Sequence, residues 1–287
     1  MKRNLDSVKP YLPPNVKQTI KQTAFLHRVL TGQLRMLPDF IIIGVQKCGT
    51  TSLYNYLTAH PGIAPAYRKE VSFFDYNFEK GAIWYRAHFP SLLSKVRGQN
   101  LITGEATPCY IFHPLAPKRI SKMIPTVKLI LLLRNPVDRA YSHYQHSLRL
   151  GVENLSFEEA LTEAKKLRGE TEKIVQHEDF HSLYNSRAAY LSRGIYMDQL
   201  EAWTSLFPRE QMLILKSEDF YTDPQPIVSR VFEFLELPDW KPEKYRRYNY
   251  GGTAKMDASM RSHLIDYFKP YNHRLYEYLG VDFGWDE

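Results

Sequence analysis

Residues 38–56 read PDFIIIGVQKCGTTSLYNY, and this stretch decides the fold. Its first part, Phe40 to Ile43, is a short apolar run rich in β-branched residues, which is typical of a buried strand. Apolar residues at helical spacing follow from Ser52 to Leu57. A strand, a glycine-bearing turn and a helix N-terminus form an anion site, because unpaired N–H groups converge there and the helix dipole favours negative charge.

The turn between this strand and helix resembles a nucleotide P-loop, with one departure. Gly44, four residues and Gly49 match the start of GxxxxGK[ST], but Thr50 stands where the lysine belongs. The lysine is Lys47, two residues before Gly49. Gly49 allows close approach of the backbone to an anion, and hydroxyl groups add donors. The candidate anion-binding residues are Lys47, Cys48, Gly49, Thr50, Thr51 and Ser52. An ordinary strand-turn-helix with a chance lysine is the alternative.

A second informative stretch, residues 68–75, reads RKEVSFFD. We expect Phe73 and Phe74 to anchor this segment in the core and so to hold Glu70 in place. A carboxylate held beside an anion site is a candidate general base for an attacking hydroxyl. The alternative is a surface ion pair of Lys69 and Glu70 beside a core anchor.

Two further strand ends carry polar residues. Residues 127–133, VKLILLL, form the clearest buried strand, and Arg134 follows it directly. The planar guanidinium suits phosphate, and Ser142, in the helix that begins near Pro136, adds a hydroxyl. The alternative for Arg134 is a structural salt bridge. Residues 101–105 form another strand, whose last residue, Glu105, could orient a neighbour, bind an acceptor or cap the backbone.

These motifs together resemble the sulfotransferases that use 3′-phosphoadenosine 5′-phosphosulfate (PAPS), in particular the heparan sulfate N- and 3-O-sulfotransferases and soluble bacterial members. The resemblance spans about 39–285. It implies that Glu70 is the catalytic base, that Lys47 contacts the transferring group and that Arg134 and Ser142 bind the 3′-phosphate. Lys255 is the best substitute for a phosphate contact in the loop that this family closes over the nucleotide. Ser72 replaces a histidine of those enzymes, and Ala106 replaces a lysine.

Composition agrees with an enzyme that binds anions. The chain has 287 residues, of which 44% are hydrophobic, enough for one large core. Its charge of +7 favours anionic ligands without choosing among PAPS, nucleic acid, a polyanionic glycan and a membrane surface. The two cysteines argue against a disulfide scaffold. Because no apolar run approaches the length of a membrane span or a signal peptide core, we expect a cytoplasmic protein.

The first 38 residues form a basic arm before a single domain at 39–287. Asn15 is a candidate cap for a helix from Val16 to about Leu30. Its expected apolar face consists of Val16, Ile20, Ala24 and Leu30. This helix either packs on the domain or lies on a membrane surface, with Lys17, Lys21 and Arg28 on its polar side.

Strands that alternate with helices predict an α/β fold, a P-loop-like parallel sheet flanked by helices. The expected activity is transfer of a sulfuryl group from PAPS to a hydroxyl or amine of a glycan or small natural product. The product of PAPS would be 3′,5′-adenosine bisphosphate. We expect no metal and no nucleic-acid partner, and the oligomeric state stays open. A P-loop nucleotide kinase and a non-catalytic polyanion-binding module are the alternatives.

Overall fold

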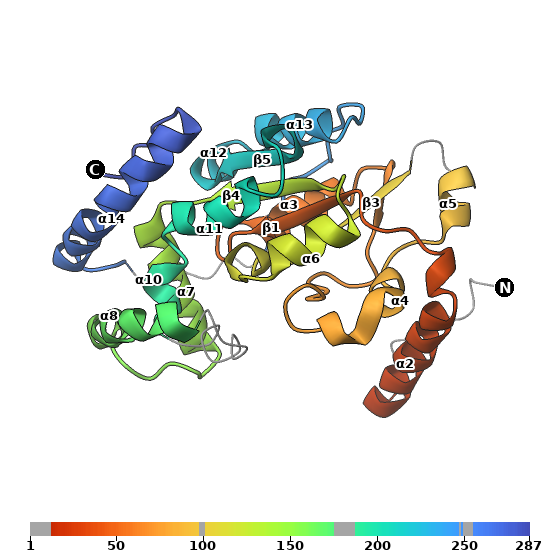
Figure 1. Ribbon diagram of the computed structural model, residues 1–287, viewed down its shortest axis with the longest axis horizontal. Helices are drawn as coiled ribbons and strands as arrows, with labels where there is room; N and C mark the ends of the chain where they lie inside the picture. Colours follow the sequence, from red (N-terminus) through yellow and green to blue (C-terminus); the bar gives the residue numbers. More distant parts are fainter. Residues whose placement is uncertain (1–12, 98–100, 175–186, 247, 249–254) are drawn as a thin grey trace.

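A five-stranded parallel sheet forms the centre of the computed structural model, which describes residues 13–97, 101–174, 187–246, 248 and 255–287. Its strands are β1 (Phe40–Gly44), β2 (Ile63–Pro65), β3 (Ile102–Ala106), β4 (Lys128–Leu133) and β5 (Met212–Lys216). The strand order is β2-β3-β1-β4-β5 (Figure 1). After β1 the chain forms the edge strand β2, returns to place β3 between β2 and β1, and then adds β4 and β5 on the other side of β1. Such a switch point opens a crevice at the carboxyl ends of the strands.

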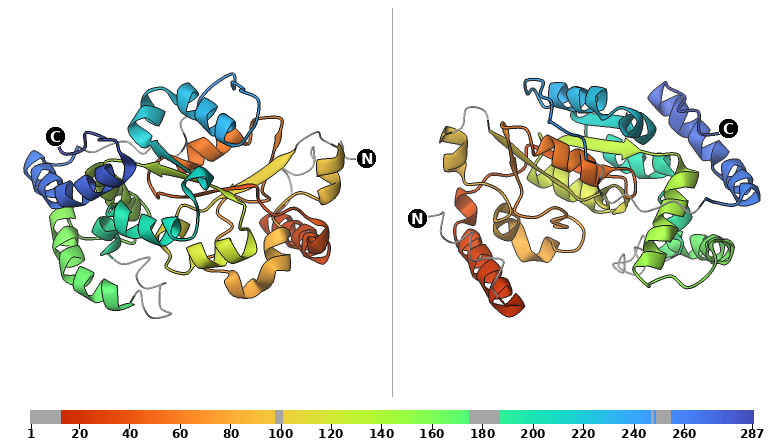
Figure 2. Two further views of the ribbon diagram at one scale, coloured as in Figure 1. Left: turned by 45° about the horizontal axis from the view of Figure 1, so that its top comes forward. Right: turned by 180° about the vertical axis from the view of Figure 1, so that it is seen from behind.

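Helices cover both faces of the sheet (Figure 2). On one face lie α3 (Thr50–Leu57) and α13 (Pro224–Phe234), and on the other lie α6 (Ala116–Met123) and α11 (Tyr196–Thr204). Because both faces are covered, Phe40–Ile43 and Leu129–Leu133 have no solvent-exposed surface. The predicted class, a parallel sheet flanked by helices, is confirmed.

The remaining elements extend this core. The helices are α2 (Pro14–Leu30), α4 (Gly81–Arg86), α5 (Leu92–Arg97), α7 (Pro136–Arg149), α8 (Phe157–Ile174), α10 (Ala189–Ser192), α12 (Ser217–Thr222) and α14 (Ala258–Leu279). Short 3-10 turns are η2 (Gly32–Leu34), η3 (Phe78–Lys80), η4 (Tyr110–Phe112) and η5 (Arg209–Gln211). In Figure 1, α2 lies at the end of the molecule opposite α7 and α8.

The N-terminal helix differs from its prediction in two respects. It begins at Pro14, and no side chain of the described residues caps it, so the expected cap at Asn15 is wrong. It docks through Phe25, whose ring lies 4.7 Å from that of His88, and through Arg28, which donates to the carbonyl of Ala87 at 2.6 Å. The expected apolar face does not pack on the domain, because Val16, Ile20, Ala24 and Leu30 are all exposed.

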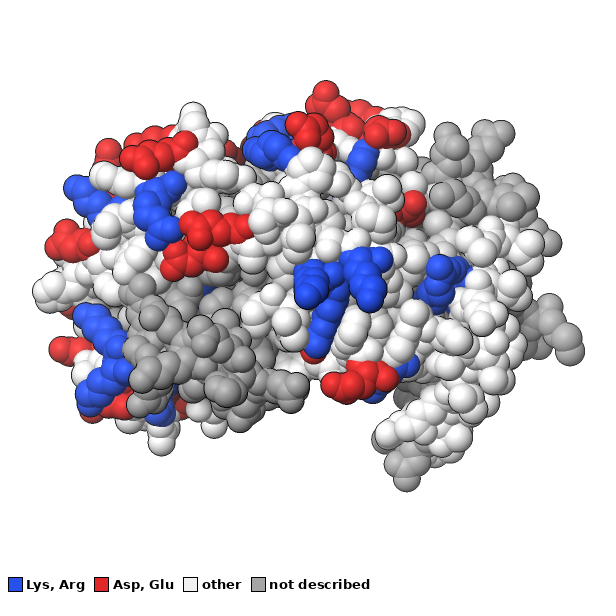
Figure 3. Space-filling model, in the orientation of Figure 1, with Lys and Arg blue, Asp and Glu red and all other residues white. Residues whose placement is uncertain are grey.

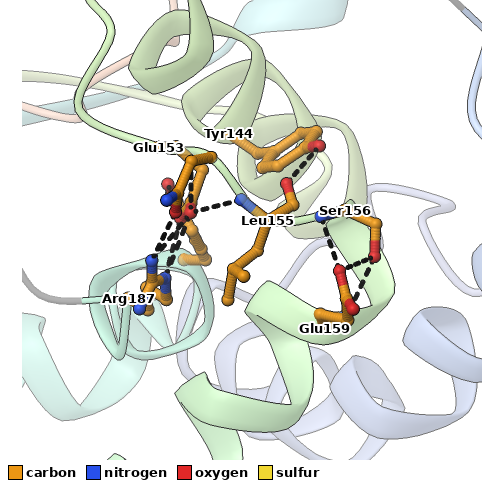
Figure 4. A network of polar contacts seen from close by, with 8 residues as sticks. Tyr144, Glu153, Leu155, Ser156, Glu159 and Arg187 are labelled. Carbon is orange, nitrogen blue, oxygen red and sulfur yellow. Dashed lines mark hydrogen bonds and ion pairs between the residues drawn. The ribbon is translucent and has the colours of Figure 1, made fainter.

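A network of polar contacts holds the segment that connects α7 to α8 (Figure 4). The Glu153 carboxylate is buried and accepts hydrogen bonds from Arg187 and from the Tyr190 hydroxyl. Burial raises its pKa, but the bonds from Arg187 and backbone amides outweigh burial and hold the pKa at about 2. Ser156 and Glu159 exchange bonds in a capping box that starts α8.

Candidate active site

The loop between β1 and α3 places a helix N-terminus at the carboxyl edge of the sheet. Gly49 precedes the helix in the left-handed region, at φ 92°. A Cβ there would also come within 3.0 Å of the Tyr221 ring, so both backbone and packing require glycine. No side chain of the described residues caps α3. A helix N-terminus without a side-chain cap is a favourable position for an anion.

Lys47 and Cys48 take different positions in this loop. Lys47 is half-buried, and burial together with the positive charges of Arg149, Arg134 and Arg139 lowers its pKa to about 8. The Cys48 side chain belongs to the core, and burial raises the pKa of its thiol to about 12. The Cys48 amide donates to the carbonyl of Val45 and its carbonyl accepts from Ser217, so Cys48 supports the loop. Lys47, in contrast, is a cation without a nearby negative charge among the described residues to balance it.

Arg134 joins the end of β4 to the same loop. One guanidinium nitrogen donates to the carbonyl of Lys47 at 3.2 Å, and the group lies 5.6 Å from the centroid of the Tyr221 ring. The Tyr196 hydroxyl donates to the carbonyl of Arg134 at 2.7 Å. A half-buried guanidinium is thereby held beside Lys47.

The remaining predicted nucleotide contacts lie around these two. Ser142 is half-buried on α7, two helical turns beyond Arg134. Its neighbour Tyr141 donates through its hydroxyl to the carbonyl of Lys255 at 3.4 Å. The Ser52 hydroxyl accepts from the amide of Tyr248 at 3.2 Å. The C-terminal segment therefore touches both α3 and α7. The family resemblance places residues 251–255 over the nucleotide, and of these 251–254 lie outside the described residues.

Glu70 reaches the site from the segment that follows β2. Its amide donates to the carbonyl of Ala106 at the end of β3, at 3.1 Å, and its own carbonyl accepts from Arg68 at 3.0 Å. The backbone takes a φ of 60°, rare for a residue with a side chain. The carboxylate is 53% exposed and accepts from Lys69 at 2.5 Å. Glu70 is thus attached to the strand beside β1.

Beneath Glu70 lies a buried polar layer centred on Glu105. The carboxylate accepts from Tyr85 and Thr107 at 2.7 Å and from Tyr110 at 3.1 Å. Burial raises its pKa to about 7. The Tyr110 hydroxyl also accepts from the amide of Phe73 at 2.8 Å. Of the roles open from the sequence, the structure shows Glu105 orienting a neighbour, because it holds the tyrosine that anchors the Glu70 segment.

Sequence reasoning missed several cations near the loop. Arg193 donates to the side-chain oxygen of Gln46 at 2.5 Å. Arg139 is fully buried and donates to the carbonyl of Tyr190, while its Nε and Nη1 have no hydrogen-bond partner among the described residues. Arg139 and His143 stand four residues apart on α7 and are both buried, so helical spacing could have revealed them.

His146 connects the two halves of the site. Burial and then the charges of Lys47 and Arg149 lower its pKa, while Glu70 raises it. His146 on α7 is thus influenced by charges from both the β1–α3 loop and the Glu70 segment. The sequence-predicted loop and arginine are joined directly, and the glutamate is attached to the end of β3, the strand on the other side of β1.

Two cavities lie away from this edge, against α8. The larger, about 480 Å³, is lined by Glu158, Glu159, Glu163 and Arg187, among others. The smaller, about 200 Å³, lies between Phe157 and Met260. Three glutamates make the larger cavity a poor site for an anion, so the β1–α3 loop is the better candidate.

The fold and this site define a P-loop-like α/β enzyme with a cationic edge. The sequence model of the sulfotransferase domain matches residues 37–250, and the chain belongs to the sulfotransferase family. It is 31% identical to the membrane-associated sulfotransferase kil1 of Dictyostelium discoideum, over 88% of this chain and 68% of that protein. It is 33% identical to human heparan sulfate glucosamine 3-O-sulfotransferase 3B1, over 88% of this chain and 66% of that one.

A solved structure has the same architecture. The sulfotransferase from Alicyclobacillus acidocaldarius superposes with a TM-score of 0.68 at 29% identity, covering 88% of this chain and all of that one. This chain spans about two thirds of the length of the curated relatives named above. Membership of the family makes the protein an enzyme that transfers a sulfuryl group.

Proposed function

We propose that the protein transfers a sulfuryl group from PAPS to a hydroxyl group, with Glu70 as the general base. One observation supports the proposal: Lys47, Arg134 and Glu70 are held at the carboxyl ends of three adjacent strands, β1, β4 and β3. Relatives in the family that are named for their acceptor act on a glucosamine of heparan sulfate. Beyond membership of the family, the proposal specifies a donor, a base and a class of acceptor for this chain.

In the proposed step, the acceptor oxygen attacks the sulfur of PAPS while its proton passes to Glu70. The bond between sulfur and the bridging oxygen of the 5′-phosphate breaks, and 3′,5′-adenosine bisphosphate leaves. Lys69 already occupies one carboxylate oxygen of Glu70, so the other oxygen is the one that would meet the acceptor. Glu70 has the exposure that such an encounter requires.

Lys47 and the α3 amides would stabilise the charge that builds on the transferring and leaving groups. Burial and then the nearby cations lower the pKa of Lys47, and these cations give the site excess positive charge before any ligand binds. A bound dianion would remove that excess. Arg134 and Ser142 would hold the 3′-phosphate, and Lys255 would approach it from the C-terminal segment.

The kinase alternative needs an acidic residue that binds magnesium beside the P-loop. Of the two strands beside β1, β4 is followed directly by Arg134, and β3 carries Glu105, whose carboxylate is buried and already bonded by three hydroxyl groups. Within the described ranges, no group of three acidic, histidine or cysteine side chains is arranged around a metal position. An arginine at this position favours a phosphate over a cation, so we prefer the sulfotransferase mechanism.

For the acceptor, we propose a hydroxyl-bearing glycan as the first class to test and small natural products as the second. The substitutions at Ser72 and Ala106 change the surroundings of Glu70. Ser72 takes a φ of 52°, and its carbonyl accepts from Asn77 at 2.7 Å. Ala106 is buried. Neither residue supplies the cation found in the heparan enzymes, so an acceptor less anionic than heparan sulfate fits better.

Thermal unfolding with added ligands tests the donor. At about 100 times its dissociation constant, 3′,5′-adenosine bisphosphate should add roughly 2.7 kcal/mol of stability, with or without EDTA. Stabilisation by ATP and magnesium alone would favour the kinase, and stabilisation by heparin alone would favour a polyanion-binding module. Transfer from labelled PAPS to a panel of glycans and small hydroxyl compounds then identifies the acceptor.

We further propose that residues 39–287 form the catalytic domain and residues 1–38 an accessory arm. Within the described ranges, no helix is both long and apolar enough to cross a bilayer. A cytoplasmic location stays a prediction, which fractionation of the expressed protein would check. The relative from Dictyostelium discoideum is named as membrane-associated, so the membrane fraction belongs in that measurement.

A further inference from the structure

The outer face of α2 is apolar and uncovered. Val16, Ile20, Leu26 and Leu30 are 41%, 46%, 59% and 79% exposed. At about 100° per residue, these four side chains fall within an arc of roughly 120°. An apolar stripe of this width is what a helix normally turns toward a core. Here it faces away from the domain.

Contacts between the opposite side of α2 and the domain determine the orientation of the helix. Phe25 stacks among the rings of Tyr67, Trp84 and His88 on the domain. Arg28 donates to two carbonyl groups at the end of α4, those of Ala87 and Phe89. These contacts commit the inner side of the helix, so its outer face cannot turn inward without breaking them.

The apolar surface continues beyond the helix. Leu34 is 65% exposed, and a backbone bridge between Arg35 and Ser91 brings it beside α5. The first two residues of α5, Leu92 and Leu93, are 45% and 67% exposed. We call Val16, Ile20, Leu26, Leu30, Leu34, Leu92 and Leu93 the outer patch. In Figure 3 the described atoms of α2 form a white, uncharged ridge at the lower right.

The net charge of the N-terminal arm indicates what kind of partner the outer patch binds. Residues 1–38 contain seven lysines and arginines and one acid, Asp6, which gives a net charge of +6 out of +7 for the whole chain. The helix itself contains no acidic residue. Two copies of this arm would repel each other, whereas an anionic surface would attract it. An apolar stripe on a basic helix suits the interface of an anionic bilayer.

We propose that the outer patch docks on a membrane surface rich in anionic lipid, with α2 lying in the plane of the interface. On its inner side the helix packs against Tyr67, which follows the carboxyl end of β2 and stands three residues before Glu70. This inference goes beyond the proposed function and does not depend on the identity of the donor or acceptor.

Sedimentation of the full chain with lipid vesicles tests the proposal. The protein should bind vesicles that contain phosphatidylglycerol, and less well vesicles of phosphatidylcholine alone or at high salt. The double variant Leu26→Gln/Leu30→Gln should lose about tenfold or more of this affinity, because both leucines would leave the lipid. A matched control, Leu206→Gln/Val281→Gln, changes two apolar residues that are 46% and 47% exposed elsewhere, and it should bind normally.

Both double variants should unfold at the temperature of the parent, since all four side chains are exposed. Absence of binding to anionic vesicles, or equal binding by the Leu26/Leu30 variant, overturns the proposal. A dimer in light scattering that the same variant abolishes would assign the outer patch to a second copy instead. Vesicle binding that appears only after deletion of residues 1–12 would assign it to that segment.

Discussion

Two layers at the carboxyl edge of the sheet use acidic side chains in opposite ways. In the upper layer, Glu70 is half-exposed and paired with its neighbour Lys69. In the lower layer, Glu105 has no solvent contact and is bonded by Tyr85, Thr107 and Tyr110. The upper carboxylate can meet a substrate, whereas the lower one supports the segment that carries it. Proximity to an active site therefore does not make a carboxylate catalytic; exposure and bonding partners separate the two roles.

The replacement Glu70→Gln gives the largest expected effect, because it removes the proposed proton acceptor while nearly keeping shape. We expect kcat to fall about 10²–10⁴-fold. Affinity for the bisphosphate and the unfolding temperature should hardly change. Glu79→Gln, in the following η3 turn, is the matched control and should turn over normally. Near-normal turnover of Glu70→Gln on the true acceptor would mean that another group is the base. The contrast between a catalytic Glu70 and a supporting Glu105 would then be wrong.

The replacement Arg134→Lys tests the nucleotide side of the upper layer. Lysine keeps the charge but loses the planar fork. Since hydrogen bonds to charged groups contribute about 1.5–3 kcal/mol, PAPS should bind roughly ten- to hundredfold more weakly. Adenosine 5′-phosphosulfate, which lacks the 3′-phosphate, should lose less. Calorimetric titration of both ligands measures the difference, and equal losses would place Arg134 away from the 3′-phosphate.

A pair of tyrosine variants examines the lower layer. Tyr85→Phe and Tyr110→Phe each remove a bond to Glu105, and we expect each to cost about 1–3 kcal/mol of stability. Only Tyr110→Phe also releases the amide of Phe73, and hence the Glu70 segment. Its kcat should fall about tenfold or more, because small displacements of a reacting group are costly. Equal kcat values for the two variants would show that the lower layer does not position Glu70.

The smallest expected effect is a pH dependence that originates at Lys47. Its pKa of about 8 in the free protein means that it loses its proton as pH rises through that value. A bound phosphate favours the protonated form and raises this pKa, so bisphosphate affinity should be highest below pH 8. Above pH 8 it should fall by at most tenfold per pH unit, the limit for one proton.

Titrations at several pH values measure this decline, and Lys47→Arg supplies the control. Arginine stays protonated throughout the range, so the decline should disappear in this variant. A parent affinity that stays constant from pH 7 to about 9.5 would mean that Lys47 does not bind the anion.

Patterns that are local in the chain predicted most of the framework. The apolar run at Phe40–Ile43 and the one that ends at Leu133 became adjacent central strands, because a buried parallel strand needs apolar side chains on both faces. The prediction that the apolar face of α2 packs on the domain was wrong, for a physical reason. The spacing was correctly amphipathic, but spacing cannot tell which side meets the domain, and Phe25 with Arg28 decided that.

The sequence by itself determined the strand-turn-helix around Gly49, since only glycine readily takes the left-handed backbone that this turn requires. It also supplied the candidate residues Lys47, Glu70 and Arg134. Only the tertiary structure decided the environments of these groups. The low pKa of Lys47, the interior position of Glu105 and the outward face of α2 depend on burial and on partners remote in sequence. Desolvation and Coulomb interactions act through space, and a linear pattern carries no record of either.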